Sequence, residues 1–255
     1  MLKYPISKLL FTIIMVMMLS LDMYGFSFSA YWYALPVILF LSLVAMGSFL
    51  IQWKFFIESK NNGVREGNRV SLTFDDGPHE VYTNKVLDIL DKYNAKATFF
   101  CVGKKLQNQP ALANEIVNRG HSIGNHSYTH QYKFPMFTTK RMIDEIEKTN
   151  SIIEIILGIK TNLFRPPFGV TNPRIVRAIN HIQMEVIGWN VRSYDTVDDN
   201  IENVIKRVTK KLMAGGIVLL HDNRENISVI LEGILKYMKE QKLKSVCVED
   251  LLKLK

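Results

Sequence analysis

The chain has 255 residues, of which 47% are apolar, and a formal net charge of +8. That length and apolar fraction fit one large folded domain with an additional segment. The basic residues are interleaved with acidic ones, as in KYMKEQKLK, and no arginine-rich or aromatic-interleaved patch occurs, which argues against a nucleic-acid partner. Weak attraction to anionic lipid headgroups is compatible with this charge.

The N-terminal quarter is strongly apolar. Between Lys8 and Lys54 the only charged residue is Asp22, so the tract is too long for a single membrane span of about 20 residues and suits two. The expected spans run from Leu9 to Tyr24 and from Trp32 to Ile51, joined by GFSFSA. We therefore expect residues 1–54 to form a two-helix membrane anchor in the cell membrane and residues 55–68 to form a polar linker.

Two other interpretations of this tract are a cleaved signal peptide and a pair of buried core helices. A signal peptide has no second long span, and no small-residue cleavage site stands out here. Cleavage after the first segment would still leave the second as an anchor. Lipid is therefore an expected partner of the chain.

The topology is less constrained. Basic residues precede the first span and follow the second, and the link between the spans has no Lys or Arg. The positive-inside rule then favours a hairpin with the N-terminus and the large domain in the cytoplasm. If only one segment crosses the membrane, the domain faces outward, so its side stays open.

From residue 69 to 255, β-prone runs alternate with amphipathic segments. Seven strands are expected, in RVSLTFD, KATFFCV, HSIGN, NLFRPP, MEVIGW, GIVLLHD and SVCVE. Helices are expected over 81–93, over 139–157 with Gly158 as the stop, after Asn172-Pro173, after Asp198 and over 227–241. This alternation predicts an α/β fold with a parallel sheet, open or closed, and seven strands come close to the eight of an α/β barrel. Cys101 and Cys247 lie in apolar runs and are expected to be buried thiols without a disulfide.

Polar residues gather where these strands end, which is where α/β barrels place their chemistry. They are Asp75 and Asp76, Asn125 and His126, Arg165, Asp195, and His221 with Asp222. The adjacent acids Asp75 and Asp76 repel each other unless a positive charge lies beside them.

A metal ion can supply that charge. His126 and His130 are spaced i and i+4, so on a helical turn both imidazoles bind one ion from the same face. Two histidines and one carboxylate leave a coordination position open for water, as in a catalytic zinc site. The second acid then stands beside the water as a base. This ligand set also accepts cobalt, nickel or iron.

The remaining polar residues fit supporting roles. Arg165 is suited to pair with the base carboxylate and keep it ionised. Gly169 permits a tight turn that directs a backbone N–H at an oxyanion. His221 suits a general acid, supported by Asp195 or by Asp222. The other histidines, His79, His121 and His181, are expected to be structural.

Four of these stretches, TFDDGP, HSYTH, RPPFG and the LLH of IVLLH, resemble the signature motifs of the NodB-type polysaccharide deacetylases, carbohydrate esterase family four. The resemblance covers residues 69–255. It implies a distorted seven-stranded (β/α) barrel and metal-dependent removal of N-acetyl or O-acetyl groups from sugars.

Motif by motif, the resemblance also implies a role for each residue. The implied base is Asp75, the metal ligands are Asp76, His126 and His130, and the partner of the base is Arg165. The amide of Phe168 is implied as an oxyanion donor, His221 as the acid with Asp195 beside it, and Leu219 as part of the pocket for the acetyl methyl group.

The chain departs from the family pattern at Thr196, where the family commonly has a tryptophan that forms a groove wall, and Phe168 replaces a common tyrosine. We therefore expect a membrane-anchored deacetylase acting on an N-acetylated glycan, with the groove wall altered. The alternatives are a deformylase or deacylase of a lipid-linked sugar and a glycan-binding protein without turnover. The oligomeric state does not follow from the sequence.

Overall fold

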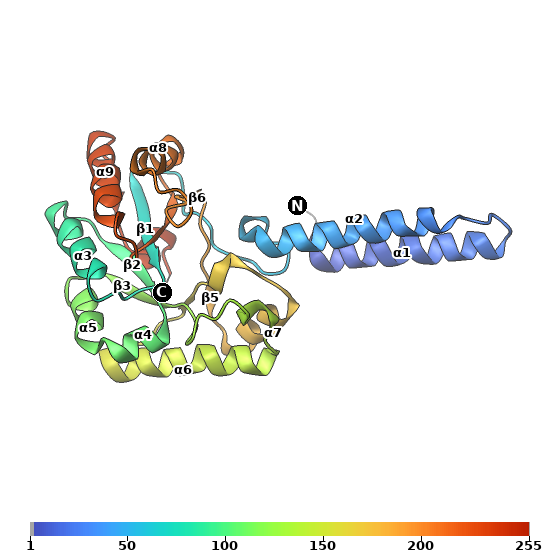
Figure 1. Ribbon diagram of the computed structural model, residues 1–255, viewed down its shortest axis with the longest axis horizontal. Coiled ribbons are helices and arrows are strands. Elements are labelled where there is room, and N and C mark those ends of the chain that lie inside the picture. Colours follow the sequence, from blue (N-terminus) through green and yellow to red (C-terminus); the bar gives the residue numbers. More distant parts are fainter. Residues whose placement is uncertain (1–2, 255) are drawn as a thin grey trace.

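The computed structural model describes residues 3–254, so residues 1 and 2 of the expected anchor and residue 255 of the expected domain lie outside it. The chain forms a long helical hairpin and an α/β domain, and the hairpin projects from one side of the domain (Figure 1).

The hairpin consists of α1 (Tyr4–Met23) and α2 (Ala30–Phe49). Both helices have 20 residues and a mean hydropathy of 1.9, enough by length and composition to cross a membrane. Each begins earlier in the chain than its predicted span. Asp22 lies near the tip, where its carboxylate accepts hydrogen bonds from the Tyr33 hydroxyl and the Phe28 amide, both at 2.6 Å. The carboxylate of the only acidic residue in the hairpin therefore has two hydrogen-bond donors within the hairpin.

Eight parallel strands form one sheet, and seven of them follow the order β5–β4–β3–β2–β1–β7–β6, with β8 beside β1. This curved path is the predicted (β/α) barrel, distorted because β5 and β6 at its two ends do not pair. The strands are β1 (Arg69–Asp75), β2 (Ala97–Cys101), β3 (Ser122–Asn125), β4 (Leu163–Phe164), β5 (Glu185–Val186), β6 (Val191–Arg192), β7 (Ile217–His221) and β8 (Lys244–Ser245).

Two strand predictions need correction. β6, with only two residues, is missing from the strands expected from the sequence. The last predicted strand, SVCVE, is wrong beyond Ser245, because the chain turns into helix α10 (Val248–Leu252). The Val248 amide donates to Thr98 Oγ1 at 2.9 Å, and Glu249 and Asp250 occupy the first turn, where acids favour a helix.

The helices cover the outer face of the sheet (Figure 1). They are α3 (Tyr82–Lys92), α4 (Gly103–Asn108), α5 (Pro110–Asn118), α6 (Thr139–Leu157), α7 (Pro173–Ile182), α8 (Ile201–Lys211) and α9 (Ile227–Glu240). The predicted ends of α6 are confirmed: the Thr138 side chain caps its first turn, and Gly158 adopts a φ of 66° after its last. The Asn172 side chain caps α7 in the same way, at the amides of Arg174 and Ile175.

Alternation along the strands separates two environments. In β1, Val70, Leu72 and Phe74 face the helices and belong to the larger apolar core. The residues that alternate with them, Ser71, Thr73 and Asp75, are polar yet buried. Because successive side chains point to opposite faces, the polar set lines the inside of the barrel. Both cysteines are free and buried, as predicted.

Residues 60–63 bridge the open side of the barrel. The Lys60 amide donates to Val186 O at 2.8 Å, the Gly188 amide donates to Lys60 O at 3.0 Å, and the Gly63 amide donates to Gly215 O at 2.8 Å. Part of the segment expected to be a linker is thus packed against the ends of β5 and β7.

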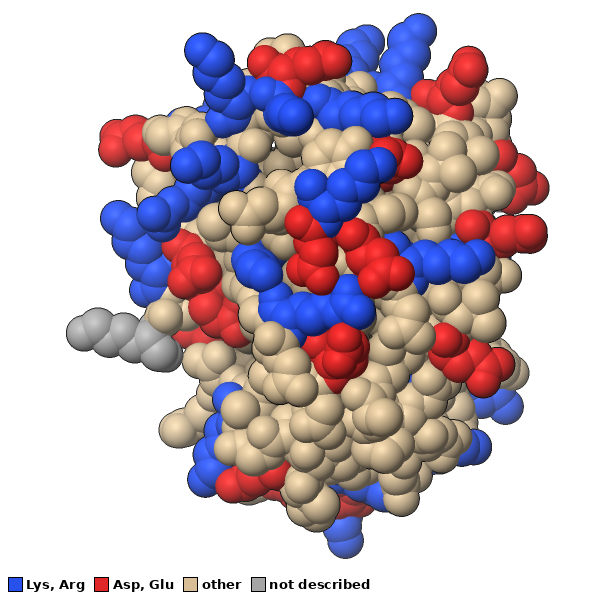
Figure 2. Space-filling view, turned by 90° about the vertical axis from the view of Figure 1, so that its left-hand side faces the viewer, with Lys and Arg blue, Asp and Glu red and all other residues tan. Residues whose placement is uncertain are grey.

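Charged side chains of both signs are interspersed on the face that Figure 2 shows. Arg119, for example, pairs with Asp88 and Asp91 at 2.8 and 2.9 Å. Such exposed pairs contribute little to stability individually.

Candidate active site

The polar residues expected at the site meet at the carboxyl ends of the parallel strands. Asp75 ends β1 and is in register with His221 at the end of β7. Leu219, two residues earlier in β7, is in register with Thr73. Because these residues alternate with outward-facing ones, Asp75, Leu219 and His221 share the inner face.

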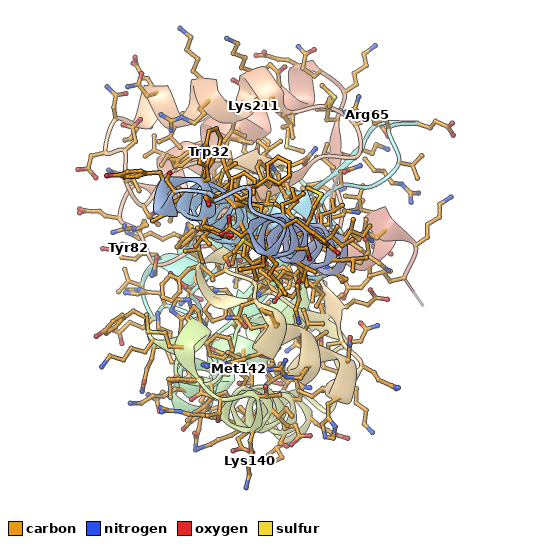
Figure 3. All side chains as sticks on the ribbon, turned by 90° about the vertical axis from the view of Figure 1, so that its right-hand side faces the viewer. Trp32, Arg65, Tyr82, Lys140, Met142 and Lys211 are labelled. Carbon is orange, nitrogen blue, oxygen red and sulfur yellow. The ribbon has the colours of Figure 1, made fainter. Side chains whose placement is uncertain are left out.

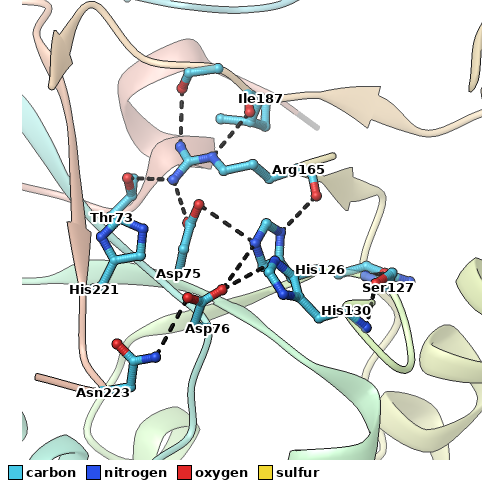
Figure 4. A network of polar contacts seen from close by, with 12 residues as sticks. Thr73, Asp75, Asp76, His126, Ser127, His130, Arg165, Ile187, His221 and Asn223 are labelled. Carbon is cyan, nitrogen blue, oxygen red and sulfur yellow. Dashed lines mark hydrogen bonds and ion pairs between the residues drawn. The ribbon is translucent and has the colours of Figure 1, made fainter. Parts of the chain in front are cut away.

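Arg165 follows β4 and is completely buried, with all of its contacts inside the barrel (Figure 4). Its Nη1 donates to Asp75 Oδ1 and to Thr73 Oγ1, both at 2.7 Å. Its other donors reach the carbonyls of Ile187 and Gly188 at 3.1 and 3.0 Å. Burial lowers the pKa of Arg165, and the charge of Asp75 opposes that shift. The guanidinium therefore fixes one oxygen of Asp75, and the other, Oδ2, lies 3.7 Å from His126 Nε2.

Asp76, His126 and His130 come together on the other side of Asp75, with ligand atoms of the three within 4.8 Å of one another. His126 Nε2 lies 3.5 Å from Asp76 Oδ1, and His130 Nε2 lies 3.2 Å from the same oxygen. The two histidines come from the loop after β3 and not from a helical turn, which corrects the expected local structure. Ser127 and His130 adopt positive φ values of 62° and 50° there, and the ring centroids are 4.7 Å apart.

This histidine loop is held by residues that the motifs do not include. Asn125 Oδ1 accepts from the Ser127 amide at 2.8 Å. The buried Glu145 accepts from the amides of Tyr128 and Thr129 at 3.1 and 2.8 Å. Glu145 lies on the apolar face of α6, between Met142 and Ile146, so a carboxylate on that face was the signal in the sequence that could have identified it.

The geometry fits a divalent cation. His126 Nδ1 lies 2.8 Å from Arg165 O, so a proton on Nδ1 leaves Nε2 free to bind metal. His130 Nε2 is buried and has no well-aligned hydrogen-bond partner among the described residues. Burial lowers the pKa of His130 to about 4, which keeps the imidazole neutral. Burial works to raise the pKa of Asp76, but the neighbouring imidazoles outweigh it and hold that pKa well below its ordinary value.

His221 lies across the site from these three residues. Its Nδ1 is 2.8 Å from Asp195 Oδ1, and its amide donates to Asp195 Oδ2, also at 2.8 Å. Burial works to lower the pKa of His221, but the hydrogen bond and charge of Asp195 outweigh it and raise the pKa. Of the two acids considered from the sequence, Asp195 contacts the imidazole, whereas Asp222 is buried and accepts from the Thr83 hydroxyl.

Asp75, Asp76, His126, His130 and His221 line one cavity of about 310 Å³. Phe168, with φ 61°, and Gly169, with φ 66°, form one wall. A Cβ on Gly169 would lie 2.3 Å from the Trp189 ring, so the close turn requires glycine. Leu219 forms the apolar part of the lining. Three further lining residues, Trp189, Arg192 and Arg224, were not expected from the sequence. Thr196, noted there only as a departure from the family pattern, also lines the cavity.

Comparison with known proteins places these observations in a family. The family model described as polysaccharide deacetylase matches residues 62–187. The peptidoglycan-N-acetylglucosamine deacetylase of Bacillus cereus is 32% identical over 191 residues, covering 73% of this chain and 89% of that protein. The chain belongs to the polysaccharide deacetylase family. The family predicted from the motifs is thereby confirmed.

Other members of this family show similar agreement. Peptidoglycan-N-acetylmuramic acid deacetylase PdaC of Bacillus subtilis is 33% identical over 189 residues, 73% of this chain but only 39% of PdaC. The PdaC structure superposes with a TM-score of 0.69 over 74% of this chain and 91% of the solved chain, at 32% identity. A family-four pseudoenzyme from Bacillus anthracis superposes equally well, at 30% identity over 75% of this chain and 67% of that one. Fold alone therefore does not decide activity within this polysaccharide deacetylase family.

Proposed function

We propose that this polysaccharide deacetylase is a membrane-anchored, metal-dependent hydrolase that removes the N-acetyl group from a glycan of the peptidoglycan type. One observation carries the proposal: Asp75, the Asp76–His126–His130 cluster and His221 line the same cavity, with Arg165 bonded to Asp75 and Asp195 bonded to His221. The named activities of the relatives support the choice of substrate.

In this proposal Asp76, His126 and His130 hold a divalent ion, with zinc favoured by the two imidazoles and one carboxylate and cobalt, nickel or iron accepted by the same set. When bound, such an ion polarises the acetyl carbonyl and makes water more acidic.

The chain's own residues then move the protons. Asp75, held by Arg165, takes a proton from water as the water oxygen attacks the carbonyl carbon. The Phe168 amide donates to the developing oxyanion, and Leu219 contacts the acetyl methyl group. His221, whose pKa Asp195 raises, gives a proton to the sugar nitrogen as the C–N bond breaks. The products are acetate and a free amine.

Acetate release from an N-acetylated oligosaccharide, with and without added zinc, tests this function. Asp75→Asn should lower kcat by roughly 10²- to 10⁴-fold because the base is lost, while bound metal stays near one ion per chain. Unchanged activity in Asp75→Asn would refute the assigned base. Wild-type protein that binds glycan but never releases acetate would place the chain with the pseudoenzyme instead.

A second candidate is the removal of a formyl or acyl group from a lipid-linked sugar. Lys3 precedes α1, Lys8 lies near its start and Lys54 follows α2, a placement that favours a cytoplasmic domain, which could not reach mature cell-wall polymer. A topology reporter fused after Lys255 separates the two: an outside domain supports polymer, and an inside domain supports the lipid-linked substrate.

A further inference from the structure

The hairpin side of the domain carries an exposed surface that the catalytic site does not use. This hairpin-side patch consists of two apolar tips, Tyr132 and Met136, and four cations, Lys133, Lys140, Arg174 and Arg177. The tips belong to the loop around the 3₁₀ turn η2 (Phe134–Met136), where Tyr132 is 75% and Met136 74% exposed. Large apolar side chains at the tip of a loop, among cations, are typical of surfaces that meet a lipid interface.

Hydrogen bonds connect this patch to the end of the hairpin. The Thr171 amide donates to Ser48 O at 2.9 Å, at the last turn of α2. The next residue, Asn172, donates from its side chain to Pro135 O at 2.8 Å, and Arg174 Nη1 donates to Met136 O at 2.9 Å. The loop is thus fixed beside α2. In Figure 1, α7 and the N-terminal end of α6 lie on the side of the domain from which the hairpin projects.

The cations of the patch are free to meet anionic groups. All four are exposed, and the lysine and arginine ion pairs within the described residues involve other side chains. Asp144, four residues after Lys140 on α6, pairs with none of them. In Figure 3, which views the molecule from the hairpin side, Lys140 points outward at the lower edge. Each such cation gains from an anionic bilayer surface only within about a Debye length of it.

The hairpin sets that distance. Each of its helices spans about 30 Å, the thickness of the hydrocarbon core, so almost no length remains to lift the domain away from the headgroups. Ile51, just after α2, is buried in the domain core, and Ser59 Oγ donates to Ile51 O at 2.9 Å, so no slack segment intervenes.

We propose that the hairpin-side patch docks the catalytic domain on the headgroups of an anionic bilayer, with Tyr132 and Met136 entering the interface. The inference rests on membrane insertion of the hairpin, which is part of the proposed function, and it does not depend on deacetylase activity. The occupant is a lipid surface, because the loop that carries the apolar tips is fixed beside the end of the same hairpin.

The test uses the full chain in lipid nanodiscs of phosphatidylcholine, with or without about one-third phosphatidylglycerol. A bimane label on Met136→Cys reports contact through quenching by spin-labelled lipid, and Ile155→Cys, exposed at the far end of α6, is the matched control. The buried Cys101 and Cys247 are shielded from the label. We expect at least twofold stronger quenching at position 136 than at 155, rising with phosphatidylglycerol content.

Charge reversal isolates the electrostatic part. Lys133→Glu with Lys140→Glu should return the quenching at position 136 to its level in phosphatidylcholine alone. Lys210→Glu with Lys211→Glu makes the same charge change on α8, where Lys211 lies on the opposite side of the hairpin from Lys140 in Figure 3, and should have no effect. Equal quenching at 136 and 155, or indifference to both lipid charge and reversal, would overturn the docking while leaving the anchor intact. A chain that fails to insert into nanodiscs at all would overturn both.

Discussion

The two sides of the active-site cavity hold histidines that are buried to a similar degree but whose pKa values are shifted in opposite directions. The His130 side chain is 18% exposed and the His221 side chain 17%, so burial does not distinguish them. Burial lowers the pKa of His130 to about 4, whereas Asp195 raises the pKa of His221 through a contact at its Nδ1. The partner of the ring, and not its depth, separates a residue suited to bind metal from one suited to donate a proton.

Removing each imidazole in turn tests whether the two histidines have separate roles. His130→Ala and His221→Ala should both lower kcat by roughly 10²-fold or more. Only His130→Ala should also lose the metal, because His221 lies outside the ligand cluster. Metal content per chain after dialysis, read beside acetate release, checks the difference. Loss of metal in His221→Ala would show that the two sides are not separate.

The two sides depend on Arg165, which holds Asp75 between them. Arg165→Met should lower stability by about 3–5 kcal/mol, because it leaves Asp75 buried beside an apolar side chain. For a domain of this size that corresponds to a fall in Tm of roughly 6–20 °C. Thermal unfolding of the detergent-solubilised chain measures it. Lys105→Met, which removes a half-buried cation bonded to the Asp76 carbonyl, provides a comparison and should cost less.

The His221 side should respond to pH through its partner. Asp195→Asn removes the charge that raises the pKa of His221, so the imidazole should lose its proton at lower pH. Since the proposed acid must be protonated, the alkaline limb of kcat/KM should move to lower pH, with kcat reduced roughly tenfold. The profile from pH 6 to 10 is the measurement. An unmoved alkaline limb would assign that limb to another group.

The smallest effect concerns Asp222, which is next to His221 but has no role in the proposed chemistry. Burial raises the pKa of Asp222 to about 7. In the unfolded chain this carboxyl loses its proton near pH 4, so stability falls as pH rises from about 4 to about 7 and then levels off. Asp222→Asn should remove part of that fall and gain roughly 1–2 kcal/mol above pH 7, with no gain at pH 4. Tm against pH for both proteins tests this.

The sequence predicts the parts of this molecule whose signals are local. The alternation in RVSLTFD gives β1 its bounds and places Asp75 on the inner face, Gly158 ends α6, and the cap at Asn172 begins α7. The family resemblance named Asp75, Asp76, His126, His130 and His221, and the structure brings these five together at one cavity. Their catalytic roles remain predictions.

What the sequence does not predict depends on contacts between distant residues. β6 has two residues and exists only because Val191 and Arg192 pair with β7. SVCVE is β-prone, yet Thr98, about 150 residues earlier, accepts from the Val248 amide at the start of a helix. Glu145 supports the histidine loop from α6, and neither residue spacing nor composition connects the two.

Gly188 connects the packed segment before the barrel to the active site by two hydrogen bonds of its backbone. Its amide donates to Lys60, just beyond the hairpin, and its carbonyl accepts from the guanidinium that grips Asp75. A shortened protein starting at Arg69 would keep every signature motif but leave that glycine without its upstream partner. A load applied to the hairpin would thus reach the Asp75 carboxylate through Gly188 and Arg165.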